Sequence, residues 1–326
     1  MDIHFLLWLQ SIRESLPAFV TAFFEAVSHI AQSKAQIFAI AIVYWCFSKE
    51  LGQRIVLAFS TSALLNNFIK VVVCAYRPWI REPMLRPPVA SQAEATGYSF
   101  PSGHTQAATS IYGTAGNYAF RRGHKVIAIL LWVFVALVAF SRNFLSCHTP
   151  QDVIVALLES IAVIAFVEWL VGWVDSKPNR DLIVLVVALA VFAVTTAIAF
   201  LKPYPVDYDA AGNVLVEGAV MRLDFSKTAG MYAGVFLGWF LERRYIRFEV
   251  PKKKDVKQMA IRLVVGLAVL VVCYLIAKSM AALGIPQDIY EILRYFFILF
   301  AATFFSPLAS TMVERRLLRK EATLAR

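Results

Sequence analysis

The sequence predicts an all-α fold, a polytopic bundle of transmembrane helices. Of the 326 residues, 59% are hydrophobic and only 17% are charged, and the mean hydropathy is +0.64. An ordinary soluble domain is about half apolar and about a quarter charged, so the composition excludes a soluble enzyme and a disordered chain. Apolar stretches recur along the chain at lengths suited to bilayer crossings, which take roughly 20 residues each and predict about eight to ten crossings.

The elements follow from where these stretches fall. Residues 1–18 predict an amphipathic interfacial helix, because apolar and polar positions alternate and Trp8 suits the headgroup level. The stretch 19–48 is apolar but interrupted by polar residues, and it predicts one crossing, mostly 35–48, with a second at 16–31 as the alternative. Clearer crossings are expected at 51–73, 104–120, 125–141, 151–174, 182–201, 227–242, 260–283 and 290–313. The total is nine, or ten with the alternative.

The formal charge of +10 has a simple explanation in membrane topology. Basic residues gather in segments that alternate with the other loops, namely 49–54, 121–125, 175–181, 242–258 and the C-terminal tail. The positive-inside rule places these segments and the C-terminus in the cytoplasm of a cell whose plasma or inner membrane holds the protein. The acidic loop 202–226 then lies outside. No nucleic-acid partner is expected, because the basic excess is a topology signal.

Three polar clusters contain nearly every residue that could do chemistry, and all fall on the predicted extracytoplasmic side. They are Lys70-x6-Arg77-Pro78, Pro101-Ser102-Gly103-His104 and Ser141-Arg142-x5-His148-x3-Asp152. The four cysteines include no Cys-x-x-Cys pair, and no three His, Asp or Glu residues stand at helical ligand spacing. Neither a metal nor another cofactor is therefore predicted.

Each cluster has a functional and a structural interpretation. Lys70 and Arg77 share one helix face, where a lysine near an apolar core usually has a function, although Lys70 could also extend to the headgroups. Ser102 can cap a helix beginning at His104 and leave N–H groups for an anion, or form a plain cap. Asp152 stands one turn beyond His148 and can orient its imidazole, or act as a capping-box carboxylate.

Taken together, the clusters favour phosphate chemistry. Three cations match a phosphate and the charge that spreads over its oxygens in the transition state. Two histidines suit a nucleophile and a general acid near neutral pH. A non-catalytic binder would need only the cations.

The clusters resemble the signature of the type-2 phosphatidic acid phosphatase superfamily, also called lipid phosphate phosphatases. That signature reads Lys-x6-Arg-Pro, Pro-Ser-Gly-His and Ser-Arg-x5-His-x3-Asp, and every position is filled here within residues 70–152. The surrounding six-helix core, about 35–174, is similar in layout. The apparent nine-span plan also resembles the glucose-6-phosphatase branch.

The resemblance implies a role for each residue. His148 is the nucleophile that forms a phosphohistidine, Asp152 orients it, and His104 protonates the leaving oxygen. The phosphate is held by Lys70, Arg77, Arg142 and the backbone N–H groups of Ser102 and Gly103. Ser141 and Pro101 support the loops. No metal is needed.

The resulting hypothesis is a lipid phosphate phosphatase acting at the extracytoplasmic face. Residues 1–174 would hold the interfacial helix and phosphatase core, and 175–326 about three further spans and the basic tail. This second part could shape the lipid path, a headgroup pocket or a homodimer face. Expected substrates are undecaprenyl diphosphate, phosphatidylglycerol phosphate or phosphatidate. The alternatives are a phosphotransferase acting on a lipid or sugar hydroxyl, a phosphatase for a soluble sugar phosphate, and a non-catalytic lipid-phosphate binder or transporter.

Three further features of the sequence are less specific. The proline-rich loop 78–101 predicts either a stiff connector or a lid over the phosphate site. The pairs Asp224–Lys227 and Glu291–Arg294, spaced i,i+3 near span ends, predict structural ion pairs.

Overall fold

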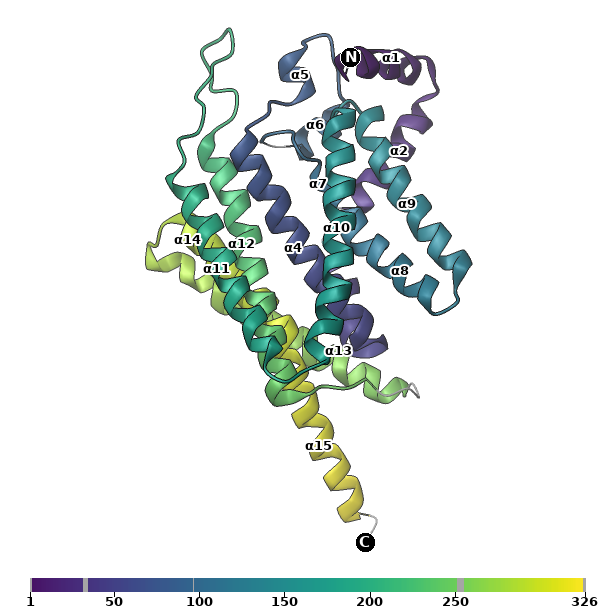
Figure 1. Cartoon of the computed structure of the whole chain (residues 1–326), viewed down its shortest axis with the longest axis vertical. Helices are drawn as coiled ribbons and strands as arrows, with labels where there is room; N and C mark the ends of the chain where they lie inside the picture. The colour runs from purple at the N-terminus through teal and green to yellow at the C-terminus, as the bar shows by residue number, and fades with distance from the viewer. Residues whose placement is uncertain (1, 32–34, 96, 251–254, 325–326) are drawn as a thin grey trace.

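The computed structural model describes residues 2–31, 35–95, 97–250 and 255–324, and these form a helical bundle (Figure 1). The described residues contain no β-strand, only an isolated bridge between Tyr208 and Val214. The predicted all-helical, polytopic class is therefore confirmed.

The first half of the chain forms ten α-helices among the described residues. They are α1 (Asp2–Ser15), α2 (Ala18–Ile30), α3 (Ala35–Ile42), α4 (Lys49–Val73), α5 (Pro78–Arg81), α6 (Val89–Glu94), α7 (Gly103–Ala108), α8 (Thr114–Arg121), α9 (Lys125–Phe144) and α10 (Pro150–Asp175). The second half adds α11 (Arg180–Leu201), α12 (Gly218–Leu241), α13 (Val256–Ser279), α14 (Gln287–Phe300) and α15 (Ser306–Leu324). Short π-helical turns join several of these, at Val43–Phe47, Thr109–Gly113, Glu242–Ile246 and Ala301–Phe305, and a 3-10 turn covers Met280–Leu283.

Six helical segments of the described chain are long and apolar enough to cross a membrane. They are Lys49–Arg81, Lys125–Phe144, Pro150–Asp175, Arg180–Leu201, Val256–Leu283 and Gln287–Leu317. A seventh would be the bent pair Ala18–Ile30 and Ala35–Phe47, whose axes differ by 50°. The protein is thus an integral membrane protein, while the nine-span layout stays a prediction.

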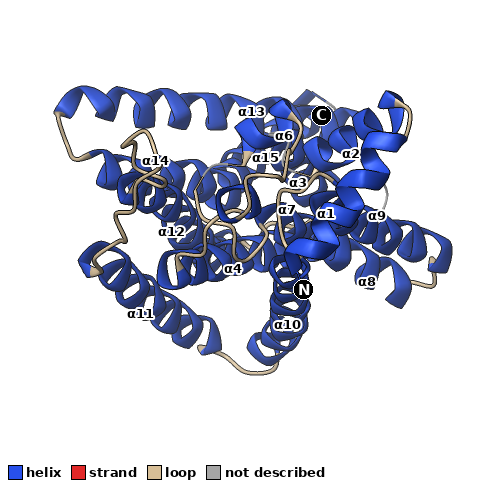
Figure 2. Ribbon diagram, turned by 90° about the horizontal axis from the view of Figure 1, so that it is seen from above, coloured by secondary structure: helices blue, strands red, loops and turns tan. Residues whose placement is uncertain are grey.

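Two expected crossings are helical but too polar to qualify. Residues 104–120 form α7, a π-turn and α8, and 227–242 fall mostly in α12. Both lie inside the bundle: α7 packs on α4, α9 and α10, and α12 packs on α4, α11 and α14. Figure 2 shows α4 and α7 near the middle of the bundle. A helix surrounded by other helices does not need a lipid-compatible surface, so polar residues are tolerated there.

The structure corrects the expected loop 202–226. Helix α12 begins at Gly218, so the loop is shorter by nine residues. The reason is that Met221 and Phe225, one turn apart, are both buried in the core. Asp224 therefore belongs to a helix face inside the bundle.

Close packing fixes α12 against α14. Glycines recur every fourth residue at Gly230, Gly234 and Gly238. A Cβ atom at Gly230 would overlap the carbonyl oxygen of Ile292, and one at Gly234 would overlap that of Phe296. Small residues at this spacing let two helix backbones touch. This packing fixes the position of α12 beside α4.

The two ends of the bundle differ in character. The short helices α5 and α6 lie at one end, together with α1 and the beginning of α10 (Figure 1). The beginning of α4 and the turn between α10 and α11 lie at the other end, where the basic segments 49–54 and 175–181 are found.

Candidate active site

The first cluster places two cations inside the protein. Lys70 lies in the last turn of α4, and Arg77 stands directly before α5, where Pro78 takes the first helical position. Their exposed fractions are only 8% and 4%. Lys70 lines an internal cavity, and its ammonium group has no hydrogen-bond or ion-pair partner among the described residues. A buried cation without a partner is costly, and it indicates a site for an anion.

His148 is held between a cation and a carboxylate. Its Nε2 lies 2.8 Å from Nη1 of Arg77, and its Nδ1 lies 3.5 Å from Oδ2 of Asp152. Because the guanidinium can only donate, Nε2 must be the acceptor, and the ring proton sits on Nδ1 facing the carboxylate. Burial, followed by Arg77 and the other nearby cations, lowers the pKa of His148 well below its usual value. The imidazole is therefore neutral, with its lone pair on Nε2.

Asp152 both caps the beginning of α10 and lies against the imidazole of His148. Its Oδ2 accepts hydrogen bonds from the Thr149 backbone N–H at 2.8 Å and from the Ser99 hydroxyl at 2.5 Å. Thr149 Oγ1 accepts in return from the Asp152 backbone N–H at 3.3 Å, which completes a capping box at the beginning of α10. The cap fixes the carboxylate in place beneath the imidazole of His148.

The second cluster joins this arrangement through the backbone. Ser102 caps α7 with its side chain and donates its own N–H to the Asp152 carbonyl oxygen at 2.9 Å. Gly103 lines the cavity, and Pro101, which follows a cis peptide bond, is buried.

His104 faces the cavity from the first turn of α7 and is 4% exposed. Its Nε2 has no hydrogen-bond partner among the described residues and lies 3.9 Å from Oε2 of Glu94. Oε1 of Glu94 is 2.9 Å from Nδ1 of His29. Together His104 and His29 lower the pKa of Glu94 to about 2. The loop 78–101, expected to be a connector or a lid, thus brings a carboxylate to His104.

Arg142 is fully buried near the end of α9. Its carbonyl oxygen accepts hydrogen bonds from Cys147 and His148 backbone N–H groups at 3.0 and 3.2 Å, which turns the chain back toward the site. Its Nη1 donates to the hydroxyl of Ser28, but Nε and Nη2 have no partner in the described part of the chain. Ser141 donates only to the Val138 carbonyl within its own helix, at 2.7 Å.

A cavity of about 420 Å³ is lined by some of these residues, namely Lys70, Arg77, Glu94, Gly103, His104 and His148, whereas Arg142 and Asp152 are not among its lining residues. Lys70, Arg77, His104 and His148 occupy one part of its wall, and a second part is apolar. The apolar part includes Ile37, which is 37% exposed on the outside of the bundle. It continues into a smaller apolar pocket between α3, α4, α12 and α14. The cavity therefore has a polar end and an apolar extension.

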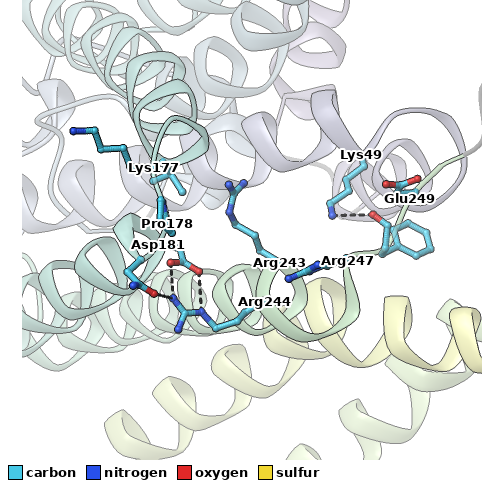
Figure 3. Close-up of a pocket in the computed structure, with 11 residues that line it drawn as sticks. Lys49, Lys177, Pro178, Asp181, Arg243, Arg244, Arg247 and Glu249 are labelled. Carbon is cyan, nitrogen blue, oxygen red and sulfur yellow. Dashed lines mark hydrogen bonds and ion pairs between the residues drawn. The ribbon is translucent and has the colours of Figure 1, made fainter.

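A larger pocket, of about 570 Å³, lies at the opposite end of the bundle and is strongly basic (Figure 3). Its cations are mostly engaged already: Arg244 binds Asp181, Arg243 binds Asp175, and Lys49 binds Glu242 and a backbone carbonyl oxygen. Its lining residues include no histidine, cysteine, serine or threonine. The cavity around His148 is therefore the better candidate.

The sequence did not indicate four side chains near the site. They are Ser99, which binds Asp152, Glu94, which faces His104, and Asp224 and Lys227, which line the cavity. The expected ion pairs Asp224–Lys227 and Glu291–Arg294 do form, at 2.8 and 2.7 Å. The sequence showed only the i,i+3 spacing of each pair. It did not show that α12 directs Asp224 and Lys227 toward the cavity.

Comparison with known families identifies the class of protein that this fold and site define. Residues 52–176 match the profile of the PAP2 superfamily, and residues 226–315 match the transmembrane extension of PAP2 superfamily phosphatases. The chain therefore contains a PAP2 superfamily domain, the type-2 phosphatidic acid phosphatase domain expected from the motifs, followed by the transmembrane extension of that superfamily.

Curated relatives are similar over parts of the chain. Phosphatidylglycerophosphatase B of Bacillus subtilis is 29% identical over 135 residues, which cover 40% of this chain and 60% of that protein. Phosphatidylglycerophosphatase B of Escherichia coli is 39% identical over 75 residues, covering 23% and 30%. Undecaprenyl-diphosphatase of Sulfolobus acidocaldarius is 28% identical over 111 residues, covering 34% and 50%. Each match spans less than two thirds of the relative's length. No solved structure matches the chain significantly.

Proposed function

We propose that this protein is a membrane phosphatase that hydrolyses a phosphate monoester or diphosphate of a lipid. The observation that carries the proposal is the buried, unpartnered ammonium group of Lys70 in the same cavity as His148. Arg77 and the free nitrogens of Arg142 add two further cations beside it. The apolar extension of the cavity supports a lipid rather than a soluble substrate, and the names of the relatives agree with this class.

The mechanism follows from the orientation of His148. When a phosphate enters, its oxygens draw Arg77 away from Nε2, and the freed lone pair attacks phosphorus. The bond to the leaving oxygen breaks, and that oxygen takes a proton from His104. Asp152 stabilises the positive charge that appears on the imidazole. Water then attacks the phosphorus of the phosphohistidine and gives a proton to His104. The N–P bond breaks, inorganic phosphate leaves, and Nε2 of His148 is free again.

For its location, we propose that the site faces the extracytoplasmic side of a plasma or inner membrane. Support comes from the basic segments at the opposite end of the bundle and the positive-inside rule. Arg122→Cys and Gly212→Cys, made separately in a background with Cys273 replaced by serine and the three buried cysteines left in place, report sidedness with an impermeant maleimide. Labelling of intact cells at 212 and not at 122 is expected, and the reverse would place the site in the cytosol.

The activity itself is tested by phosphate release from purified protein in detergent. The panel contains undecaprenyl diphosphate, phosphatidylglycerol phosphate, phosphatidate and a soluble sugar phosphate, with water as the only acceptor. We expect release from at least one lipid, loss of release in His148→Ala, and normal release in the matched control His124→Ala, whose side chain is exposed. Full activity of His148→Ala, or release only from the sugar phosphate, would refute the proposal.

A further inference from the structure

The wall of the cavity next to Lys70 is contributed by α12, in the part of the chain that follows the phosphatase core. Asp224 and Lys227 line this wall, and Lys227 Nζ donates to Asp224 Oδ1 at 2.8 Å. Their side chains are 32% and 35% exposed, and both line the cavity. The close packing of α12 on α14 at Gly230 and Gly234 holds this pair in position.

The cavity is lined by more cations than those beside the nucleophile, together with two carboxylates, Glu94 and Asp224. A phosphate monoester carries about two negative charges near neutral pH, and Lys70, Arg77 and Arg142 already offer three positive ones beside His148. Lys227 is a further cation in the same cavity, outside the cluster that surrounds the nucleophile.

The partner of Lys227 does not prevent it from binding a ligand. A half-exposed ion pair contributes only about 0–1 kcal/mol, so the ammonium group can leave Asp224 at little cost. A charge-assisted hydrogen bond to a phosphate oxygen is about twice as strong as a neutral one. A second anionic group on the substrate would therefore displace the carboxylate as the partner of Lys227.

We propose that Lys227 binds a second phosphate group of the lipid substrate, while the first lies against His148. The subsite presupposes the proposed phosphatase activity and adds a preference within it. It favours lipids with two phosphates, either joined directly as a diphosphate or separated by a glycerol unit. A lipid with a single terminal phosphate leaves Lys227 paired with Asp224 and gains nothing from it.

The test compares kcat/KM of purified full-length variants on a polyprenyl diphosphate, phosphatidylglycerol phosphate and phosphatidate. Lys227→Met should lower kcat/KM by about 10- to 100-fold on one or both two-phosphate lipids, the range expected for losing a charged hydrogen bond. On phosphatidate the change should stay below about threefold. Lys227→Arg should retain activity on all three lipids. The matched control Lys125→Met removes an exposed lysine at the other end of the bundle and should change nothing.

Asp224→Asn separates binding from a merely structural role. If the pair only stabilises the helix, Asp224→Asn and Lys227→Met break the same contact and should have equal effects on every lipid. If Lys227 binds phosphate, Asp224→Asn frees it and should maintain or raise kcat/KM on the two-phosphate lipids. Equal losses in both variants would overturn the subsite while the wild-type activity stands. A wild-type protein that releases phosphate from none of the lipids would overturn the proposed function and the subsite with it.

Discussion

Replacing Asp152 by asparagine removes one negative charge beneath His148 and little else. Asparagine has the same shape, and its carbonyl oxygen can still accept from the Thr149 N–H and the Ser99 hydroxyl, as Asp152 Oδ2 does now. The cap of α10 should therefore persist, and the melting temperature should change by only a few degrees. The effect on catalysis is expected to be far larger.

The magnitude follows from the geometry of the pair. Asp152 Oδ2 lies 3.5 Å from His148 Nδ1, and unit charges at that distance interact by about 4–5 kcal/mol at an effective dielectric constant near 20. The imidazole is neutral before reaction and becomes positive as Nε2 bonds to phosphorus. The carboxylate therefore stabilises the transition state more than the ground state, and its loss should lower kcat by about 1,000-fold.

The assay is single-substrate phosphate release at saturating lipid, so that kcat is measured apart from binding. The matched control is Asp175→Asn, at the far end of the same helix, where the carboxylate is 55% exposed and pairs with Arg243. That variant should keep its activity. A loss of less than tenfold in Asp152→Asn would show that this carboxylate acts only as a helix cap, and the nucleophile would have to be assigned again.

Four further outcomes can be measured on the same material. Gly234→Ala should lower the free energy of unfolding by about 1–3 kcal/mol, because α12 cannot move away from α14. The control Gly172→Ala has open space at the Cβ position and should not change stability. Equal melting temperatures of the two variants would contradict the close packing. Arg142→Lys should lower kcat/KM by about 10- to 100-fold, because lysine lacks the fork for a phosphate, while the exposed Arg122→Lys should have no effect. A lowered pKa keeps His148 neutral as the pH falls, so kcat/KM should not decline with an apparent pKa near 6.5. Such a decline, if it persists when the other histidines are replaced, would refute this. Full activity in excess chelator is expected, and its loss would count against metal-independent chemistry.

The sequence predicted the parts of the site that short-range geometry determines. His148 and Asp152 stand one helical turn apart, and the Thr149 cap between them is a local pattern, so their contact followed from the sequence. The meeting of Arg77 with His148, which are 71 positions apart, depends on how α4 and α10 pack. The family resemblance assigned both residues to one phosphate site but did not predict their contact. Helical periodicity shows which face a residue lies on and not which residue it meets.

The residues that the sequence missed share one property. Glu94 and Ser99 lie in a loop whose backbone path has no periodic signal, yet the loop folds inward and places both beside the histidines. Asp224 was assigned to a loop because a charged residue lowers the local hydropathy. Its position in α12 is determined by the burial of Met221 and Phe225 on the same helix. The polar residues between and beside these two lower the local hydropathy, so the sequence did not reveal the helix.

Two helical segments are less apolar than a membrane span requires, and both contribute polar side chains to the cavity. The helical segments that fall short of the test for membrane spans, 103–121 and 218–241, are the ones that bring His104 and Lys227 to the cavity. A polar cavity inside a membrane protein must be lined by polar side chains. The helices that carry these side chains therefore have a lower mean hydropathy. Such helices are stable only when other helices shield them from lipid, as α4, α9 and α14 do here. Low hydropathy therefore marks two of the segments that line the cavity, while Lys70 and Arg77 lie on Lys49–Arg81, a segment apolar enough to span.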